Sequence, residues 1–242
     1  MELKLFQKGF NYSQDGPGNR LVYHLKGCNM HCPWCSNPEG MKNNLDGIFT
    51  ATVEQITQEA LSSKPMFFEN GGITFTGGEC TLQYDLLKNI LKKLKNNGIN
   101  TAIETNGSHE KLAELYPFID YLIIDFKHPD DEIHKRITGV SNKLTKQNIV
   151  LACKAEKEML IRIPLINGFN SDTTSFEGFI EFFSTLENKN LAFEVLKYHE
   201  YGKEKWEKLG LNYTMKNAFV NESLRIDLEN KIKNTGHKVV RT

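Results

Sequence analysis

The sequence predicts an α/β fold organised as an incomplete (β/α)6 barrel, a TIM-like barrel of six parallel strands that stays open on one side. Short runs rich in aliphatic, β-branched and aromatic residues alternate along the chain with longer helical patterns. Such alternation with long connections indicates parallel strands joined by right-handed crossovers. Six strand–helix units are too few for the usual eight-stranded barrel. A doubly wound sheet is the alternative arrangement of the same elements.

Six short apolar runs are the candidate strands, and most of them are too short for a helix. They lie at residues 21–26, 73–76, 100–105, 121–125, 159–164 and 191–197. Helical patterns occur at residues 52–61, 86–94, 131–137, 143–154, 173–186 and 221–233, and residues 237–241 can form an edge strand. In the stretch 86–94, apolar residues recur at helical spacing with lysines between them, which is typical of a helix with one buried face.

Polar residues and glycines gather at the carboxyl ends of these strands. In chain order the groups are Cys28 to Cys35, Gly77-Gly78-Glu79, Glu104-Thr105-Asn106-Gly107, Asp125-Phe126-Lys127, Arg162 within the fifth strand, and Tyr198-His199. The carboxyl ends of parallel barrel strands meet at one face, and active sites are built there. The recurrence therefore favours the barrel and predicts a single functional site at that face.

Composition excludes several classes of protein. The 242 residues carry a formal net charge of zero, so there is no electrostatic reason to expect nucleic acid as a partner. No stretch approaches the apolar length of a membrane span, and the N-terminus lacks the apolar core of a signal peptide. Five cysteines, three of them clustered, argue against a secreted disulfide framework. We expect one cytoplasmic domain over residues 1–242.

Three of the cysteines, Cys28, Cys32 and Cys35, follow a C-x3-C-x2-C spacing. They supply three thiolates where a cubane iron–sulfur cluster takes four, which leaves one iron free to contact a substrate. A structural zinc site with His31 or His24 as the fourth ligand is the alternative. Zinc sites usually show paired cysteines or histidines, and no second pair occurs here. The other two cysteines, Cys80 and Cys153, suit small buried positions, although Cys80 follows a predicted site motif.

The cysteine spacing resembles that of the radical S-adenosylmethionine (radical SAM) superfamily. The ordered motifs around it resemble the glycyl-radical-enzyme activating enzymes, particularly those of pyruvate formate-lyase. These motifs are DGPGNR at 15–20, TFTGGE at 74–79, ETNG at 104–107, DFKH at 125–128, TGVSN at 138–142 and YHEYGKEKW at 198–206. Residues 34–39 also resemble activases of glycyl radical decarboxylases and dehydratases, which usually carry a cysteine-rich insert. No cysteine lies between Cys35 and Cys80, so we expect one cluster and no ferredoxin-like insert.

The resemblance implies cofactors and roles for individual residues. Cys28, Cys32 and Cys35 would hold a [4Fe–4S] cluster whose open iron takes the amino and carboxylate groups of S-adenosylmethionine. The implied cofactor-binding residues are Gly77, Gly78 and Glu79 at the methionine part, Trp34, Cys35 and Ser36 at adenine, Asp125, Phe126 and Lys127 at polar groups of the ligand, and His199 at the ribose and adenine. Arg162, flanked by isoleucines, should face something polar, either the ligand or a glycine loop of a partner. Glu104 stands where relatives tend to have an aspartate linked to a monovalent cation. The sequence therefore does not decide whether this chain has that cation site.

The implied reaction is reductive cleavage of S-adenosylmethionine to methionine and a 5′-deoxyadenosyl radical. This radical would remove a hydrogen atom from a glycine Cα of a partner, pyruvate formate-lyase or a related glycyl radical enzyme, with flavodoxin or ferredoxin as electron donor. The alternatives are a radical SAM enzyme acting on another peptide or a small molecule, and a zinc-stabilised binding module. Several site residues also have plain structural interpretations. Glu79 could cap a helix, Asp125 and Lys127 could form a surface pair, and His128 and His134 are expected at the surface.

Overall fold

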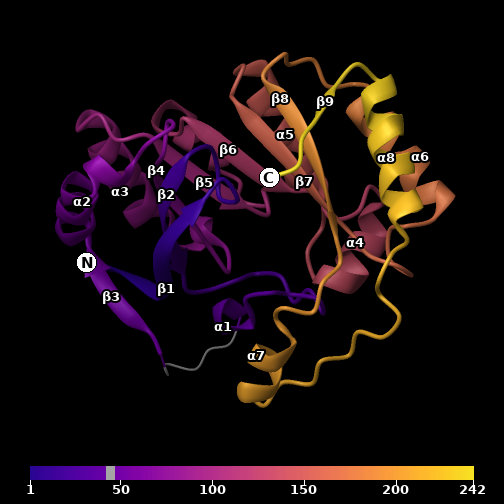
Figure 1. Ribbon diagram of the computed structural model, residues 1–242, viewed down its shortest axis with the longest axis horizontal. Helices are drawn as coiled ribbons and strands as arrows, with labels where there is room; N and C mark the ends of the chain where they lie inside the picture. The colour runs from indigo at the N-terminus through magenta and orange to yellow at the C-terminus, as the bar shows by residue number, and fades with distance from the viewer. Residues whose placement is uncertain (42–46) are drawn as a thin grey trace.

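The computed structural model describes residues 1–41 and 47–242. They form a curved nine-stranded sheet in the order β3-β1-β2-β4-β5-β6-β7-β8-β9, with helices along its outer side (Figure 1). Strands β2 and β4 to β9 run parallel to one another, while β1 pairs antiparallel with both β2 and β3. The bounds are β1 Glu2–Tyr12, β2 Asn19–Leu25, β3 Phe49–Thr52, β4 Gly72–Gly77, β5 Thr101–Thr105, β6 Tyr121–Asp125, β7 Met159–Leu165, β8 Leu191–Lys197 and β9 Lys238–Val239.

The predicted incomplete barrel is confirmed. All six predicted parallel strands are present as β2 and β4 to β8, and the expected edge strand is β9. In the described residues β3 and β9 are the two edges, so the sheet curves without closing. The antiparallel strands β1 and β3 were not predicted. Only Leu3 and Leu5 of β1 are buried, so most of this strand lacks the apolar pattern by which a strand is found in a sequence.

The six main helices occur where the sequence predicts them, with ends shifted by up to three residues. The short helices were not predicted. One of them, the connection between β5 and β6, is a 3-10 helix that contains Pro117, because proline disfavours a regular α-helix. The bounds are α1 Pro38–Met41, α2 Val53–Ser62, α3 Tyr84–Asn96, α4 Asp131–Thr138, α5 Lys143–Lys154, α6 Thr173–Phe183, α7 Lys203–Lys208 and α8 Glu222–Asn234, with 3-10 helices η1 Lys64–Met66, η2 Cys80–Gln83 and η3 Leu112–Phe118.

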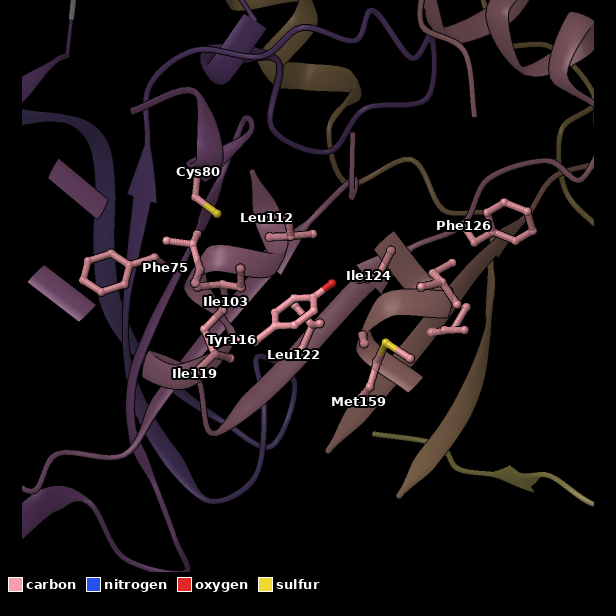
Figure 2. Close-up of a cluster of buried hydrophobic side chains, with 14 of the residues drawn as sticks. Phe75, Cys80, Ile103, Leu112, Tyr116, Ile119, Leu122, Ile124, Phe126 and Met159 are labelled. Carbon is pink, nitrogen blue, oxygen red and sulfur yellow. The ribbon is translucent and has the colours of Figure 1, made fainter. Parts of the chain in front are cut away.

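The main hydrophobic core lies between the sheet and the helices that cover its convex face. Figure 2 shows part of it, including Phe75, Ile103, Leu122 and Ile124. Successive side chains of a strand point to opposite faces, so the residues between these core positions project to the concave side. The apolar residues thus hold the outer layer together, and the inner side of the sheet is left for polar side chains.

Every helix within residues 1–41 and 47–242 is too short or too polar to traverse a lipid bilayer.

Candidate active site

A cavity of about 750 Å³ lies on the concave side of the sheet, where the carboxyl ends of the parallel strands meet. This volume is typical of pockets that bind small molecules and cofactors. The predicted convergence of polar residues is confirmed, because the cavity wall combines contributions from the cysteine loop and the ends of β4 to β8. Predicted site residues that line it are Cys28, Cys32, Trp34, Cys35, Ser36, Gly77, Gly78, Glu104, Asp125, Lys127, Arg162 and His199.

The three cysteines form one rim of this cavity. Cys32 is buried, and the thiols of Cys28 and Cys35 accept hydrogen bonds from the backbone N–H groups of Met30 (3.4 Å) and Asn37 (3.3 Å). Burial raises the pKa of Cys28 and Cys32 to about 12, and it raises the pKa of Cys35 as well. Loading the thiols with iron must therefore displace protons, so it is favoured by higher pH.

The donor set fits an iron–sulfur cluster. His31, one proposed fourth zinc ligand, is exposed, and the other, His24, lies in the cavity wall. Three thiols on the rim of a large cavity suit a cubane cluster with one iron open to a ligand.

Asp125 and Lys127 form an ion pair inside the cavity rather than at the surface. The Lys127 ammonium lies 2.9 Å from the Asp125 carboxylate, and only 9% of its side chain is exposed. Burial lowers the pKa of Lys127, but the Asp125 carboxylate and the nearby Cys32 and Cys28 outweigh it, so this pKa lies above its usual value. Lys127 is therefore a fixed positive charge next to the cysteine rim.

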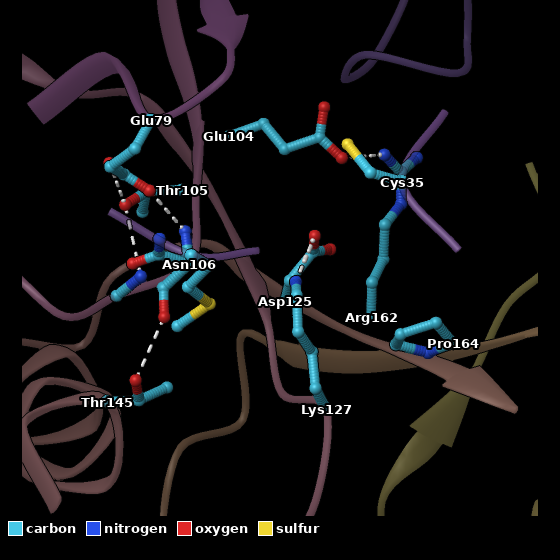
Figure 3. Close-up of polar contacts among 12 residues, drawn as sticks. Cys35, Glu79, Glu104, Thr105, Asn106, Asp125, Lys127, Thr145, Arg162 and Pro164 are labelled. Carbon is cyan, nitrogen blue, oxygen red and sulfur yellow. Dashed lines mark hydrogen bonds and ion pairs between the residues drawn. The ribbon is translucent and has the colours of Figure 1, made fainter. Parts of the chain in front are cut away.

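Arg162 lies between two carboxylates on the inner side of the sheet. Its NH1 group donates to Glu104 (2.7 Å) and its Nε donates to Glu194 of β8 (2.9 Å). The NH2 group donates to the backbone oxygen of Gln14 and to the hydroxyl of Thr242. Figure 3 shows the guanidinium facing the Glu104 carboxylate. The expectation that Arg162 faces polar groups holds, although protein carboxylates already engage it.

Protein groups contact both carboxylate oxygens of Glu104, the residue at which the resemblance raised a monovalent cation. One carboxylate oxygen of Glu104 accepts from Arg162, and the other accepts from the hydroxyl of Thr76 at 3.0 Å. The positive charge beside Glu104 is thus a guanidinium that belongs to the protein. No role in the reaction is assigned to a bound cation.

Glu79 has the capping role that was its structural alternative. Its carboxylate is buried beneath the cavity wall and accepts from the backbone N–H of Thr81 (3.0 Å), from the Thr105 hydroxyl (2.7 Å) and from the backbone N–H of Asn106 (2.7 Å). Figure 3 shows this network on the far side of Glu104 from Arg162. Glu79 thereby fastens the β4 and β5 loops to each other, and its side chain does not reach the cavity.

The two glycines before Glu79 are required by the packing of the chain on itself. Gly77 has φ +121°, and a Cβ there would lie 2.3 Å from the backbone nitrogen of Leu25. A Cβ on Gly78 would lie 2.1 Å from the carbonyl oxygen of Gly27. The glycines therefore let the end of β4 lie close to β2 and to Gly27, the residue before Cys28.

Aromatic residues of the predicted site divide between the cavity and the core. Trp34 lines the cavity and packs on Phe169, with ring centroids 4.6 Å apart. His199 also lines the cavity and stacks on Tyr201. The side chain of Phe126 is fully buried among the phenylalanines of α6, so the prediction that it contacts a cofactor is not supported. The reason is alternation, because Phe126 points away from the face that Asp125 and Lys127 share.

The prediction that His128 and His134 are surface residues is wrong, since both are about 1% exposed. Nδ1 of His128 accepts from the backbone N–H of Asp130, and Nδ1 of His134 bonds to the carbonyl of Val140. They brace the loops around α4.

Cys80 and Cys153 are buried in the core as expected.

The sequence analysis missed several residues that line the cavity or contact its lining residues. The turn after β1 supplies Gln14 and Asp15 to the wall. Glu194, flanked by apolar residues on β8, carried the same signal as Arg162 and could have been found. Trp206 donates from its indole nitrogen to the carbonyl of Cys35 at 2.9 Å, and no sequence pattern predicts that contact.

Comparisons with known proteins agree with this geometry. The family model of the Radical SAM superfamily matches residues 22–180. A pyruvate formate-lyase-activating enzyme of Staphylococcus epidermidis is 32% identical over 213 residues, which cover 84% of this chain and 84% of that protein.

Solved structures show the same fold. The crystal structure of a domain of pyruvate-formate lyase-activating enzyme from Bacteroides vulgatus matches with a TM-score of 0.57 at 26% identity, over 70% of this chain and 98% of that chain. A radical SAM methyltransferase from Sphaerobacter thermophilus, only 13% identical, matches 96% of this chain and 67% of its own with a TM-score of 0.67, and it supports the fold alone. The chain therefore belongs to the radical SAM superfamily and, within it, to the family of the pyruvate formate-lyase-activating enzymes.

Proposed function

We propose that the chain activates a glycyl radical enzyme by removing a hydrogen atom from one of its glycine residues. The observation that carries the proposal is that Cys28, Cys32 and Cys35 share one cavity with the charged groups of Asp125, Lys127 and Arg162, in a member of an activase family. Membership of the superfamily implies a [4Fe–4S] cluster and S-adenosylmethionine as cofactors.

When bound, the cluster would supply the electron that cleaves the S-adenosylmethionine sulfonium to methionine and a 5′-deoxyadenosyl radical, which takes a hydrogen atom from the glycine Cα. The protein's own part is to hold and orient. Protonated Lys127 suits the carboxylate of the methionine portion, and Asp125 suits its ammonium group or the ribose hydroxyls. Trp34 and His199 both line the cavity and offer ring surfaces to the adenine.

The proposed partner is pyruvate formate-lyase or a related glycyl radical enzyme, whose glycine loop would enter through the open side of the barrel. Flavodoxin or ferredoxin is the proposed electron donor. The described residues share one curved sheet, which supports a single domain. The three cysteines that line the cavity suit one cluster.

The test is 5′-deoxyadenosine formation by anaerobically reconstituted protein given dithionite and S-adenosylmethionine, with and without a glycyl radical enzyme from the same organism. We expect 5′-deoxyadenosine, and a glycyl radical signal in electron paramagnetic resonance (EPR) spectra when the partner is present. Formation of 5′-deoxyadenosine with no glycyl radical on any such partner would favour a different peptide or a small molecule as substrate. A protein that binds zinc in place of iron and sulfide would contradict the proposal.

Replacing Lys127 with Met should weaken S-adenosylmethionine binding while iron content stays normal. The variant keeps the side-chain volume but removes the buried charge and leaves Asp125 without its partner. Loss of one charge-assisted hydrogen bond corresponds to roughly 10- to 100-fold weaker binding, measured by equilibrium dialysis of the reconstituted protein. Lys143→Met, at a lysine whose side chain is 82% exposed, is the matched control. Equal affinities of the two variants for S-adenosylmethionine would mean that the role of Lys127 is purely structural.

A further inference from the structure

Helix α7 lies against the segment that carries Cys35. The chain leaves β8 at Lys197 and brings α7 against α1, which directly follows that segment (Figure 1). Gly202, the residue before α7, touches the segment so closely that a Cβ there would lie 2.4 Å from the carbonyl oxygen of Cys35. The approach is therefore built into the sequence, because any larger residue at this position would push α7 away.

Two side chains of α7 hold the turn that begins at Cys35. The Trp206 indole donates to the Cys35 carbonyl at 2.9 Å. The Lys205 ammonium donates to the side-chain oxygen of Asn37 at 3.1 Å and forms an ion pair with Glu39, also at 3.1 Å. Residues on both sides of the Cys35–Asn37 turn are thus fixed by a helix that lies far along the chain.

The same turn carries a hydrogen bond to a sulfur. The backbone N–H of Asn37 donates to the Cys35 thiol sulfur at 3.3 Å. Hydrogen bonds to the cysteine sulfurs and nearby charge are main determinants of the reduction potential of an iron–sulfur cluster. A helix that fixes this turn and adds a lysine beside it is placed to influence that potential.

We propose that α7 tunes the reduction potential of the cluster held by Cys35. Lys205 and Trp206 act as positioning residues, and Lys205 and Glu39 act as opposing charges on that potential. The inference rests on the proposed function, because it requires a redox-active cluster on these cysteines. Lys205 and Trp206 would not touch the substrate, so they are not catalytic residues.

Electrostatics gives the two charges opposite effects. Reduction adds a negative charge to the cluster, so the Lys205 ammonium favours the reduced form and the Glu39 carboxylate opposes it. Both side chains are about one-third exposed, so solvent screens part of each effect. Removing Lys205 should lower the potential, and removing the charge of Glu39 should raise it.

The experiment is an EPR-monitored redox titration of the anaerobically reconstituted wild type and the variants Lys205→Met, Glu39→Gln and the double variant. At a fixed potential, we expect the ratio of reduced to oxidised cluster to fall by roughly three- to tenfold in Lys205→Met and to rise in Glu39→Gln, with the double variant between them. A tenfold change corresponds to about 59 mV for a one-electron couple. Lys203→Met is the control, because Lys203 lies on the same helix but pairs with Glu200.

Trp206→Phe tests the positioning part separately. Phenylalanine keeps an aromatic ring beside Tyr213 but cannot donate to Cys35. We expect altered cluster g-values and faster loss of iron to a chelator than in the wild type.

The outcomes separate the inference from the proposed function. Shifts of the same sign in Lys205→Met and Glu39→Gln, or none beyond that of Lys203→Met, would overturn the charge part of the inference. Unchanged g-values and iron loss in Trp206→Phe would overturn the positioning part. In both cases a wild type that cleaves S-adenosylmethionine would leave the proposed function intact. A wild type that assembles no iron–sulfur cluster would contradict both.

Discussion

Cys32→Ala is expected to form no 5′-deoxyadenosine above the background of a reaction without protein. Cys32 is the middle residue of the C-x3-C-x2-C motif, and its side chain is buried at the cavity rim. Without this thiolate, the cluster would keep only two protein ligands, fewer than the cysteine coordination that holds such clusters. The measurement pairs chromatographic detection of 5′-deoxyadenosine with iron and sulfide analysis of the same sample, and we expect both to fall.

Cys153→Ala is the matched control for this loss. Cys153 is buried on α5 in the main core, among the apolar residues between sheet and helices. The same chemical change there removes one sulfur atom from packed surroundings, which costs on the order of 1 kcal/mol of stability. Iron content and 5′-deoxyadenosine formation should stay near those of the wild type. Cleavage at the wild-type rate by Cys32→Ala would remove Cys32 from the set of cluster ligands.

Much of the fold was predictable because the parallel strands are buried on both faces. Runs such as residues 121–125 and 159–164 are apolar enough to be found without a structure, and the helices between them show clear periodicity. Strand β1 was missed because most of its side chains are exposed. Its pairing with β3 joins residues far apart in the chain, such as Glu2 and Thr52, and the sequence carries no signal of that contact.

The site was predictable at the level of strands but less so at the level of side chains. The carboxyl ends of parallel strands converge, so Asp125, Lys127 and Arg162 could be placed in one cavity from their positions alone. The face of the sheet to which a side chain points follows from the alternation along its strand. Applied to Phe126, this alternation would have placed the ring in the core. The hydrogen bonds of Glu79 with Thr105 and Asn106 join two loops whose contact only the folded chain reveals.

Arg162→Met is expected to lower the free energy of unfolding by about 3–5 kcal/mol, because it leaves buried carboxylates without their counter-charge. The side chains of Arg162 and Glu194 are 7% and 3% exposed, and that of Glu104 is 20% exposed. Urea unfolding of the reconstituted protein, followed by circular dichroism under anaerobic conditions, measures the loss. Lys88→Met breaks the exposed Lys88–Glu114 pair and should cost no more than about 1 kcal/mol.

The cost of Arg162→Met should also depend on pH. Burial raises the pKa of Glu104 from 4.5 to about 7, and Arg162 opposes this rise. A carboxyl group whose pKa is higher in the folded state contributes stability at low pH that is lost as pH rises through the folded-state pKa. Without Arg162 the pKa of Glu104 should rise further, so the stability gap between wild type and variant should widen from pH 6 to pH 9.

Adding Glu194→Gln to Arg162→Met separates electrostatics from lost packing. The second substitution removes one of the two carboxylates that the guanidinium served, so part of the lost stability should return even though no contact is restored. A double variant as unstable as Arg162→Met, with a loss that is the same at pH 6 and pH 9, would mean that Arg162 acts through the volume of its side chain. Recovery would show that the inner side of this sheet is organised by charge, with Arg162 balancing Glu104 and Glu194 beside the cysteine rim.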